Sequence, residues 1–136
     1  MLNLKIGEKE YNIAFGYEAT LKSRILSKLA KMSKQKEENE KNKQTEENEN
    51  LERIEDMLLF IPDVLLIGLQ KHHEEFRYNL DTKEDYDDKK NMTFSLIDDY
   101  IDDGDNDVVE LFEKLQEELT QNGFLKKMFQ KELEKA

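Results

Sequence analysis

The most apolar stretch of the chain lies between residues 51 and 76, and its pattern is helical. Large apolar side chains recur there at steps of three and four residues, the spacing of one helix face. They are Leu51, Ile54, Leu58, Ile61, Leu65 and Leu69. Residues 57–69 are apolar on nearly every side, so we expect other helices to enclose this part. Pro62 removes a backbone donor, which predicts a kink, a break or a second helix that starts there.

Residues 2–15 alternate between apolar and polar positions instead. Two apolar sets flank a glycine-containing turn at residues 7–9: Leu2, Leu4 and Ile6, then Tyr11, Ile13 and Phe15. This period of two predicts a β-hairpin. Because two strands alone are marginal in water, the apolar face must pack on something. The hairpin either covers a helical core or pairs through its free edge with another subunit.

Helical spacing returns in four further stretches. A helix is predicted over residues 17–34, a helix start is predicted at Asp81 or Thr82, and a helix is predicted over residues 93–103 that Gly104 ends. A third is predicted to start at Asn106 or Asp107 and to stop at residues 122–123, before a final amphipathic stretch. The apolar positions are, in order, Leu21, Ile25, Leu29 and Met32; Phe94, Ile97 and Ile101; Val108, Phe112, Leu115 and Leu119; and Phe124, Leu125, Met128, Phe129 and Leu133.

Residues 34–50 contain no apolar side chain. Such a segment cannot bury enough surface to offset the entropy of ordering, so we expect a disordered connection, with a solvated helical extension as the alternative. The chain is predicted to be one domain over residues 1–136, with the hairpin at 2–15 and the main helical part at 51–136. The predicted fold class is mainly α, with an N-terminal β-hairpin packed on a bundle of about five short helices.

Composition narrows the classes of function. The chain is 39% charged and 37% hydrophobic, with a formal net charge of −11 and no cysteine. This charge opposes binding to nucleic acid through phosphates and to anionic membranes, and the lack of cysteine excludes disulfides and thiolate chemistry. The N-terminus lacks the apolar core of a signal peptide, and the apolar run is too short for a membrane span. We therefore expect a soluble protein whose acidity serves solubility, a basic partner or mimicry of nucleic acid, and the lack of cysteine suits a reducing cytoplasm.

The acidic residues concentrate between Asp81 and Asp107, where eleven acids face three lysines, a net charge of −8. Residues 102–107 suggest a calcium loop but fail the EF-hand spacing. A loop that begins at Asp103 places Val108 at the glycine position and Lys114 at the glutamate position. A loop that begins one residue earlier places Gly104 at a ligand position. The cluster is therefore predicted to form a turn and a helix cap.

No pattern of catalytic or cofactor-binding residues emerges. His72 and His73 are the only histidines, and neighbours in a helix point about 100° apart, so they cannot share a ligand face. The zinc spacing His-Glu-x-x-His, phosphate loops and nucleophile elbows are absent. We predict no catalytic, cofactor-binding or metal-binding residue. The candidate partner-binding residues are Phe124, Leu125, Met128, Phe129 and Leu133, in a stretch that either binds a partner as a helix or closes the core.

The order of these pieces resembles the tail assembly chaperones of long-tailed, siphovirus-type phages and prophages of Gram-positive bacteria. The matching pieces are Ile6-Gly7-Glu8-Lys9-Glu10-Tyr11, Pro62-Asp63-Val64-Leu65, Gly68-Leu69-Gln70-Lys71-His72-His73, Asp81-Thr82, and Ser95-Leu96-Ile97-Asp98-Asp99-Tyr100 with the helix end at Gly104. The resemblance covers the chain except residues 34–50. The family often has a proline after the histidine, where this chain has Glu74.

The resemblance implies a non-catalytic protein of the host cytoplasm that is absent from the mature virion. Its partners would be the tape measure protein, which it keeps soluble, and the tail tube protein, whose subunits it helps to recruit. The alternative is an acidic helical inhibitor or adaptor that acts as a DNA mimic on a nucleic-acid-binding partner, through Asp98, Asp99, Asp102 and Asp103. The free hairpin edge makes a homo-oligomer a further hypothesis.

Overall fold

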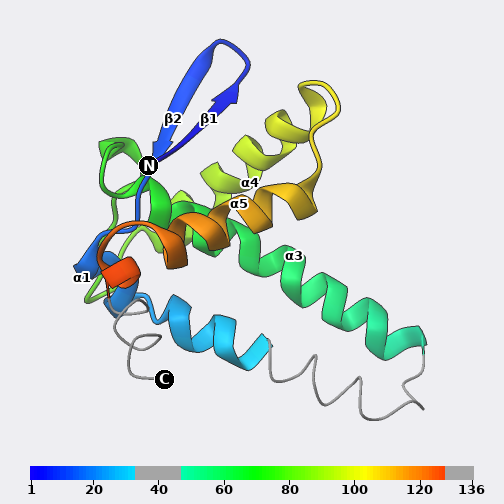
Figure 1. Ribbon diagram of the computed structural model, residues 1–136, viewed down its shortest axis with the longest axis horizontal. Coiled ribbons are helices and arrows are strands. Elements are labelled where there is room, and N and C mark those ends of the chain that lie inside the picture. The colour runs from blue at the N-terminus through cyan, green and yellow to red at the C-terminus, as the bar shows by residue number, and fades with distance from the viewer. Residues whose placement is uncertain (33–46, 128–136) are drawn as a thin grey trace.

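The computed structural model describes residues 1–32 and 47–127, with side chains from residue 51 onward in the second range (Figure 1). The elements are β1 (Leu2–Ile6), β2 (Lys9–Ile13), α1 (Tyr17–Lys22), a helical segment at residues 25–32, α3 (Glu47–Leu69), the 3₁₀ helix η1 (Glu74–Phe76), α4 (Tyr86–Asp102), α5 (Val108–Gln121) and a helical turn at residues 124–127. The predicted class, mainly α with an N-terminal β-hairpin, is confirmed.

The hairpin forms as the alternation predicts. β1 and β2 pair antiparallel, with Leu2 opposite Ile13 and Ile6 opposite Lys9. Gly7 adopts a φ of 65° in the tight turn, a conformation that costs glycine no steric clash. The inward side chains of both strands join the core, where β2 contacts α3 and β1 contacts α4 and α5. Polar contacts also hold the hairpin, among them the Gly7 N–H, which donates to Asp103 over 2.9 Å, and the N-terminal ammonium, which lies 3.3 Å from Glu118.

The C-terminal half of α3 is the centre of the core. Nearly every residue from Phe60 to Gln70 is buried, which confirms the expected enclosure for this part of the helix, whereas the exposed Leu58 and Leu59 contradict it for the turn before. β2 lies very close to it: the Ala14 N–H donates to the Gly68 carbonyl over 3.0 Å. A Cβ at Gly68 would lie only 2.5 Å from the Cγ2 atom of Ile13, so the strand fits here because this residue has no side chain.

Of the three alternatives predicted at Pro62, the break and the second helix that starts there are wrong, and the kink stays a prediction. α3 continues from Glu47 to Leu69 with the proline inside it. Proline removes one helical hydrogen bond, to the carbonyl of Leu58, and Leu58 is 39% exposed, so water can reach the outer side of this turn. Burial of the following two turns stabilises the helix far more than one lost bond costs. The Thr93 hydroxyl also donates to the Pro62 carbonyl.

Two predicted helix boundaries are also wrong. The helix expected over residues 17–34 is interrupted at residues 23–24, where Arg24 has a φ of 63°. This turn allows Ile25 to enter the core while Leu21 stays exposed, which one straight helix face could not achieve. The helix expected from Asp81 or Thr82 starts only at Tyr86, because Asn79 first accepts two backbone N–H groups in a tight loop.

The start of α5 agrees with the sequence. Asp107 caps α5 by accepting the Val109 N–H over 2.9 Å, as predicted. Of the polar stretch at residues 34–50, residues 47–50 belong to α3, so the prediction of a disordered connection is wrong for these four residues and the alternative, a helical extension, holds there. The rest of that prediction lies outside the described residues.

Candidate functional site

The C-terminal stretch was predicted to bind a partner or to close the core. Leu125 is buried in the core, with 6% of its surface exposed. Phe124 is half-buried, and its ring lies 5.3 Å from that of Tyr17. Both residues thus help to close the core on the side of α1. Met128, Phe129 and Leu133 lie outside the described residues, so their predicted role is open.

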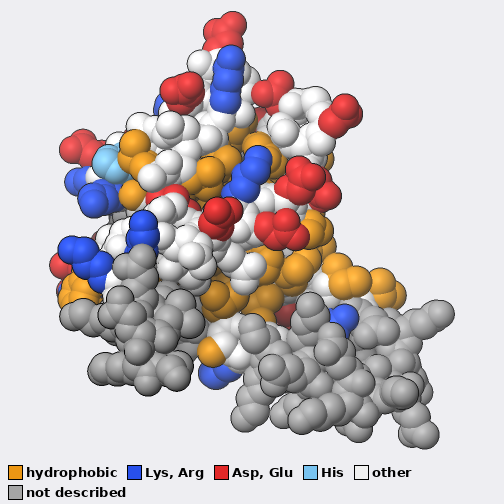
Figure 2. Space-filling model, viewed as in Figure 1, with side chains coloured by type: hydrophobic (Ala, Val, Ile, Leu, Met, Phe, Trp, Pro, Cys, Tyr) orange, Lys and Arg blue, Asp and Glu red, His pale blue; other side chains and the backbone are white. Residues whose placement is uncertain are grey.

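The apolar face of α3 continues beyond the core. Ile61, Leu65 and Leu69 are buried, whereas Leu51 and Ile54 on the same face are 64% and 46% exposed. Figure 1 shows this half of α3 extending away from the hairpin, and Figure 2 shows hydrophobic side chains gathered over it. Exposed apolar rows of this kind are typical of interaction surfaces. The apolar face of α3 therefore has two parts. Its C-terminal half is buried in the core, and its N-terminal half, which we call the free half, is exposed.

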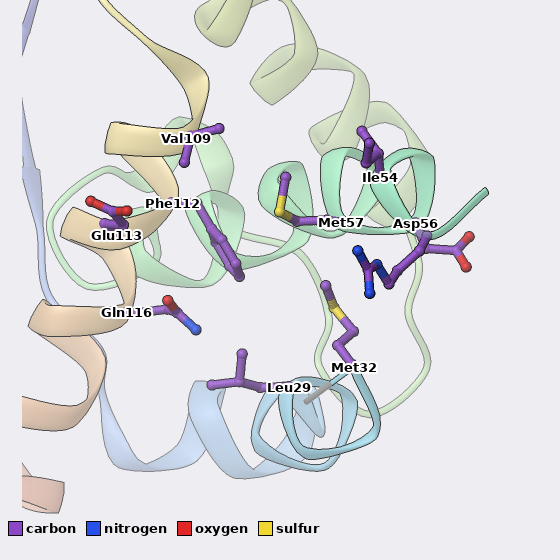
Figure 3. Close-up of a pocket in the computed structure, with 10 residues that line it drawn as sticks. Leu29, Met32, Ile54, Asp56, Met57, Val109, Phe112, Glu113 and Gln116 are labelled. Atoms are coloured by element: carbon purple, nitrogen blue, oxygen red, sulfur yellow. The ribbon is translucent and has the colours of Figure 1, made fainter. Parts of the chain in front are cut away.

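A hollow opens beside this free half, and we call it the three-helix groove. Its volume is about 360 Å³. The lining residues are Leu29 and Met32 from segment 25–32; Arg53, Ile54, Asp56 and Met57 from α3; and Val109, Phe112, Glu113 and Gln116 from α5. Figure 3 shows Leu29, Met32 and Phe112 pointing toward one shared space from the different helices. The groove is large enough and apolar enough to receive side chains of a partner.

Core packing fixes the walls of the groove. On α5, Leu111 and Leu115 are buried, and the helix therefore turns Val109, which is 43% exposed, toward the groove. Phe112 forms the floor, because its ring packs edge-on against the buried Phe60 ring with 6.1 Å between centroids. The groove is thus a preformed feature of the fold.

The rim of the groove is acidic along α5. Glu110, Glu113 and Glu117 are exposed and fall at spacings of three and four residues, so they share one side of the helix. Arg53 and Asp56 of α3 also line the groove, and Lys28 and Lys31 line an adjoining hollow that shares Met32 and Asp56 with it. No residue of α5 lines that second hollow, so the acidic rim belongs to the α5 side of the groove.

The acidic end of α4 forms a turn, as predicted. Asp98, Asp99 and Asp102 are exposed, and Asp103 holds the Gly7 N–H. Asn106 donates to the carbonyls of Tyr100 and Asp103, which closes the turn before α5. Within residues 1–32 and 47–127, no group of three His, Cys, Asp or Glu side chains is placed to hold a metal ion.

His73 packs just after the end of α3. Its Nε2 atom accepts the Asn12 N–H over 3.0 Å, and its Nδ1 atom lies 3.6 Å from Glu75. The ring also packs against Tyr11 at 5.4 Å. This residue therefore joins the hairpin to the end of α3, and its role is structural.

A polar cluster between α3 and α4 was missed by the sequence reasoning. Asp63 accepts a hydrogen bond from the Tyr86 hydroxyl and lies 3.4 Å from the Lys90 ammonium. Burial, followed by the contact with Asp63, raises the pKa of Tyr86 above its ordinary value of 10.0. Burial likewise raises the pKa of Tyr78, whose ring lies 5.2 Å from that of Tyr86. The cluster connects the two helices.

Comparisons with known proteins add no family assignment. No family model matches the chain, and searches of the curated proteins and of the solved structures found no significant match. Among the described helices, none combines the length and apolar character needed to cross a membrane.

Proposed function

We propose that this protein is a non-catalytic phage tail assembly chaperone that binds the tape measure protein, keeps it soluble and helps to recruit tail tube subunits. The observation that carries the proposal is the uncovered apolar surface of the three-helix groove and the adjoining row on α3. A chain that folded only for itself would gain stability by covering these side chains. Their exposure is consistent with a partner that covers them.

The charge of the chain supports the same function. A tape measure protein is a long, apolar helical chain that aggregates when no other protein covers its surface. A cover for it needs an apolar inner face and a charged outer face. This protein supplies both, with the groove on one side and a net charge of −11 over the whole chain. Recruitment of tail tube subunits is supported by the resemblance in motif order alone.

Co-expression tests the proposal directly. The long tape measure gene is expected downstream of this gene, with the tail tube gene upstream. We expect the tape measure protein to be insoluble when expressed alone, and to become soluble and co-purify when this protein is present. If the tape measure protein remains in the pellet and none co-purifies, the proposal is wrong.

The exposed carboxylates on α4 support a second candidate, a DNA mimic. Asp98, Asp99 and Asp102 form a compact negative surface near the end of that helix. This candidate predicts competition with DNA for a nuclease or a polymerase. Replacing the three with Asn would abolish the competition but would leave rescue of the tape measure protein unchanged, so the two functions are separable.

A further inference from the structure

We infer that the three-helix groove binds an amphipathic helix whose apolar stripe is flanked by Lys or Arg residues. The inference rests on the proposed function, since the helix would belong to the tape measure protein. It goes further because it names the surface, the secondary structure and the charge of the bound segment. Three observations support it: the walls of the groove, its lining and its rim.

The walls favour a helix over an extended segment. All three walls are helices, whose backbone N–H and C=O groups already bond within each helix. An extended guest would find few backbone partners and would bury its own polar groups unpaired. A helical guest has already paired its backbone groups, so only its side chains need to fit the groove.

The lining favours apolar side chains of varied shape. Met32 and Met57 both line the groove, together with Leu29 and Ile54, and methionine adapts its flexible side chain to irregular partners. A cavity of about 150 Å³ holds a benzene molecule, so about 360 Å³ holds roughly two large side chains. Two large apolar side chains of the bound helix, three or four residues apart in its sequence, fit this volume. The exposed row of Leu51 and Ile54 extends the contact by another turn.

The α5 rim favours basic residues on the side of the guest that faces it. Glu113 lines the groove, and Glu110 and Glu117 share its exposed side of α5. Lysine or arginine residues beside the apolar stripe of a bound helix would face these carboxylates. An acidic guest would meet like charges instead, which is unfavourable.

Methionine methyl groups provide reporters inside the groove. The chain has five methionines; Met32 and Met57 line the groove, whereas Met92 lies on α4 and Met1 at the N-terminus. The full chain, labelled at the methionine methyl carbons, is titrated with a synthetic helical peptide that carries leucines at heptad spacing and flanking lysines. We expect shifts at Met32 and Met57 and none at Met92. The same peptide with glutamates in place of the lysines should bind at least tenfold more weakly.

Substitutions at exposed positions locate the site without threatening the fold. Ile54→Glu combined with Val109→Glu should weaken peptide binding at least tenfold, whereas Phe94→Glu combined with Ile101→Glu on α4 should not change it. The latter two residues are similarly exposed and lie outside the groove. Circular dichroism checks that both variants remain folded. Equal binding by the two variants would overturn the inference.

The charge of the rim has its own matched control. Glu110→Lys, Glu113→Lys and Glu117→Lys should together weaken binding of the lysine peptide by about tenfold, because exposed ion pairs add modestly to affinity. Asp98→Lys, Asp99→Lys and Asp102→Lys give the same net charge on α4. This control should bind as the wild type does. If both variants weaken peptide binding equally, the affinity depends on the net charge of the whole protein and not on the carboxylates of the rim. This result would contradict the inference.

The outcomes separate this inference from the proposed function. Peptide shifts at Met32 and Met57 without rescue of the tape measure protein would support the groove and remove the function. Rescue that survives Ile54→Glu with Val109→Glu would remove the groove and keep the function. Two other occupants would also overturn the inference. A second copy would shift these methyl signals on dilution, and the chain's own C-terminal stretch would shift them when Phe129→Ser and Leu133→Ser are introduced.

Discussion

Tyr86 donates its hydroxyl hydrogen to Asp63 where α4 packs on α3. Because the native state holds the pKa of this hydroxyl above 10.0, its ionisation is opposed in the folded chain and free in the unfolded one. The stabilisation from this group is therefore complete below pH 10 and is lost as the pH rises through the folded pKa. At neutral pH, Tyr86→Phe removes the hydrogen bond while keeping the ring.

We therefore expect Tyr86→Phe to lower the free energy of unfolding by about 1–2 kcal/mol at pH 7. The difference between wild type and variant should shrink from pH 9.5 to pH 11, since the wild type alone must keep this tyrosine neutral. Urea unfolding at several pH values measures both effects. Tyr17→Phe, at an exposed position, is the control and should change neither. A difference independent of pH would contradict the assignment.

Gly68 is required by the close approach of β2 to α3. An added methyl group would lie 2.5 Å from Ile13, which is fully buried and cannot move aside. Gly68→Ala should therefore cost about 1–3 kcal/mol despite the better helix propensity of alanine. Gly16→Ala meets no atom within 4 Å and should change stability by about 0.5 kcal/mol or less. Thermal unfolding of both variants compares the two sites, and equal stabilities would contradict this account.

At the scale of the element, α3 is one helix with two different environments. Its C-terminal half is enclosed on all sides, whereas Leu51 and Ile54 at its other end are exposed. Hydrogen exchange should therefore protect residues 60–69 to the level of global unfolding and leave residues 51–56 much less protected. Leu65→Ala should cost about 2–5 kcal/mol, and Leu51→Ala about 0.5 kcal/mol or less. Uniform protection along α3 would contradict this division.

The sequence predicts the presence of these helices and strands better than it predicts the contacts between them. Alternation locates the hairpin, and the continuous apolar run identifies the enclosed half of α3. The turn at Arg24 and the late start of α4 escape prediction because each depends on tertiary packing: Ile25 must reach the core, and Asn79 bonds locally to two N–H groups. Periodicity gives the apolar face of a helix but does not indicate which part of that face another element covers.

The three-helix groove was missed for the same reason. Met32, Met57 and Val109 come from three separate segments of the chain, and each is an ordinary apolar position in its own helix. No spacing rule indicates that they meet. The sequence reasoning chose the C-terminal stretch because its apolar residues are dense, yet Leu125 is buried in the core. Local density of apolar residues is thus a weaker guide to a binding surface than exposure in the folded chain.

At the scale of the whole molecule, an acidic chain with an apolar groove should bind a basic helix in two stages. Long-range attraction between the net charge of −11 and the guest speeds the encounter, and burial of apolar side chains in the groove then slows release. The Debye length falls from about 10 Å at 0.1 M salt to about 3 Å at 1 M. Added salt therefore screens the encounter more than the buried contact.

Stopped-flow fluorescence with the lysine-flanked peptide separates the two stages. Raising NaCl from 0.1 M to 1 M should lower the association rate constant about tenfold or more and change the dissociation rate constant less than about threefold. Ile54→Glu with Val109→Glu should do the reverse, raising dissociation because the apolar contact is lost. Salt that acts mainly on dissociation would mean that ion pairs hold the complex. The protein would then recognise the bound helix by its charge alone, and the apolar groove would not contribute to binding.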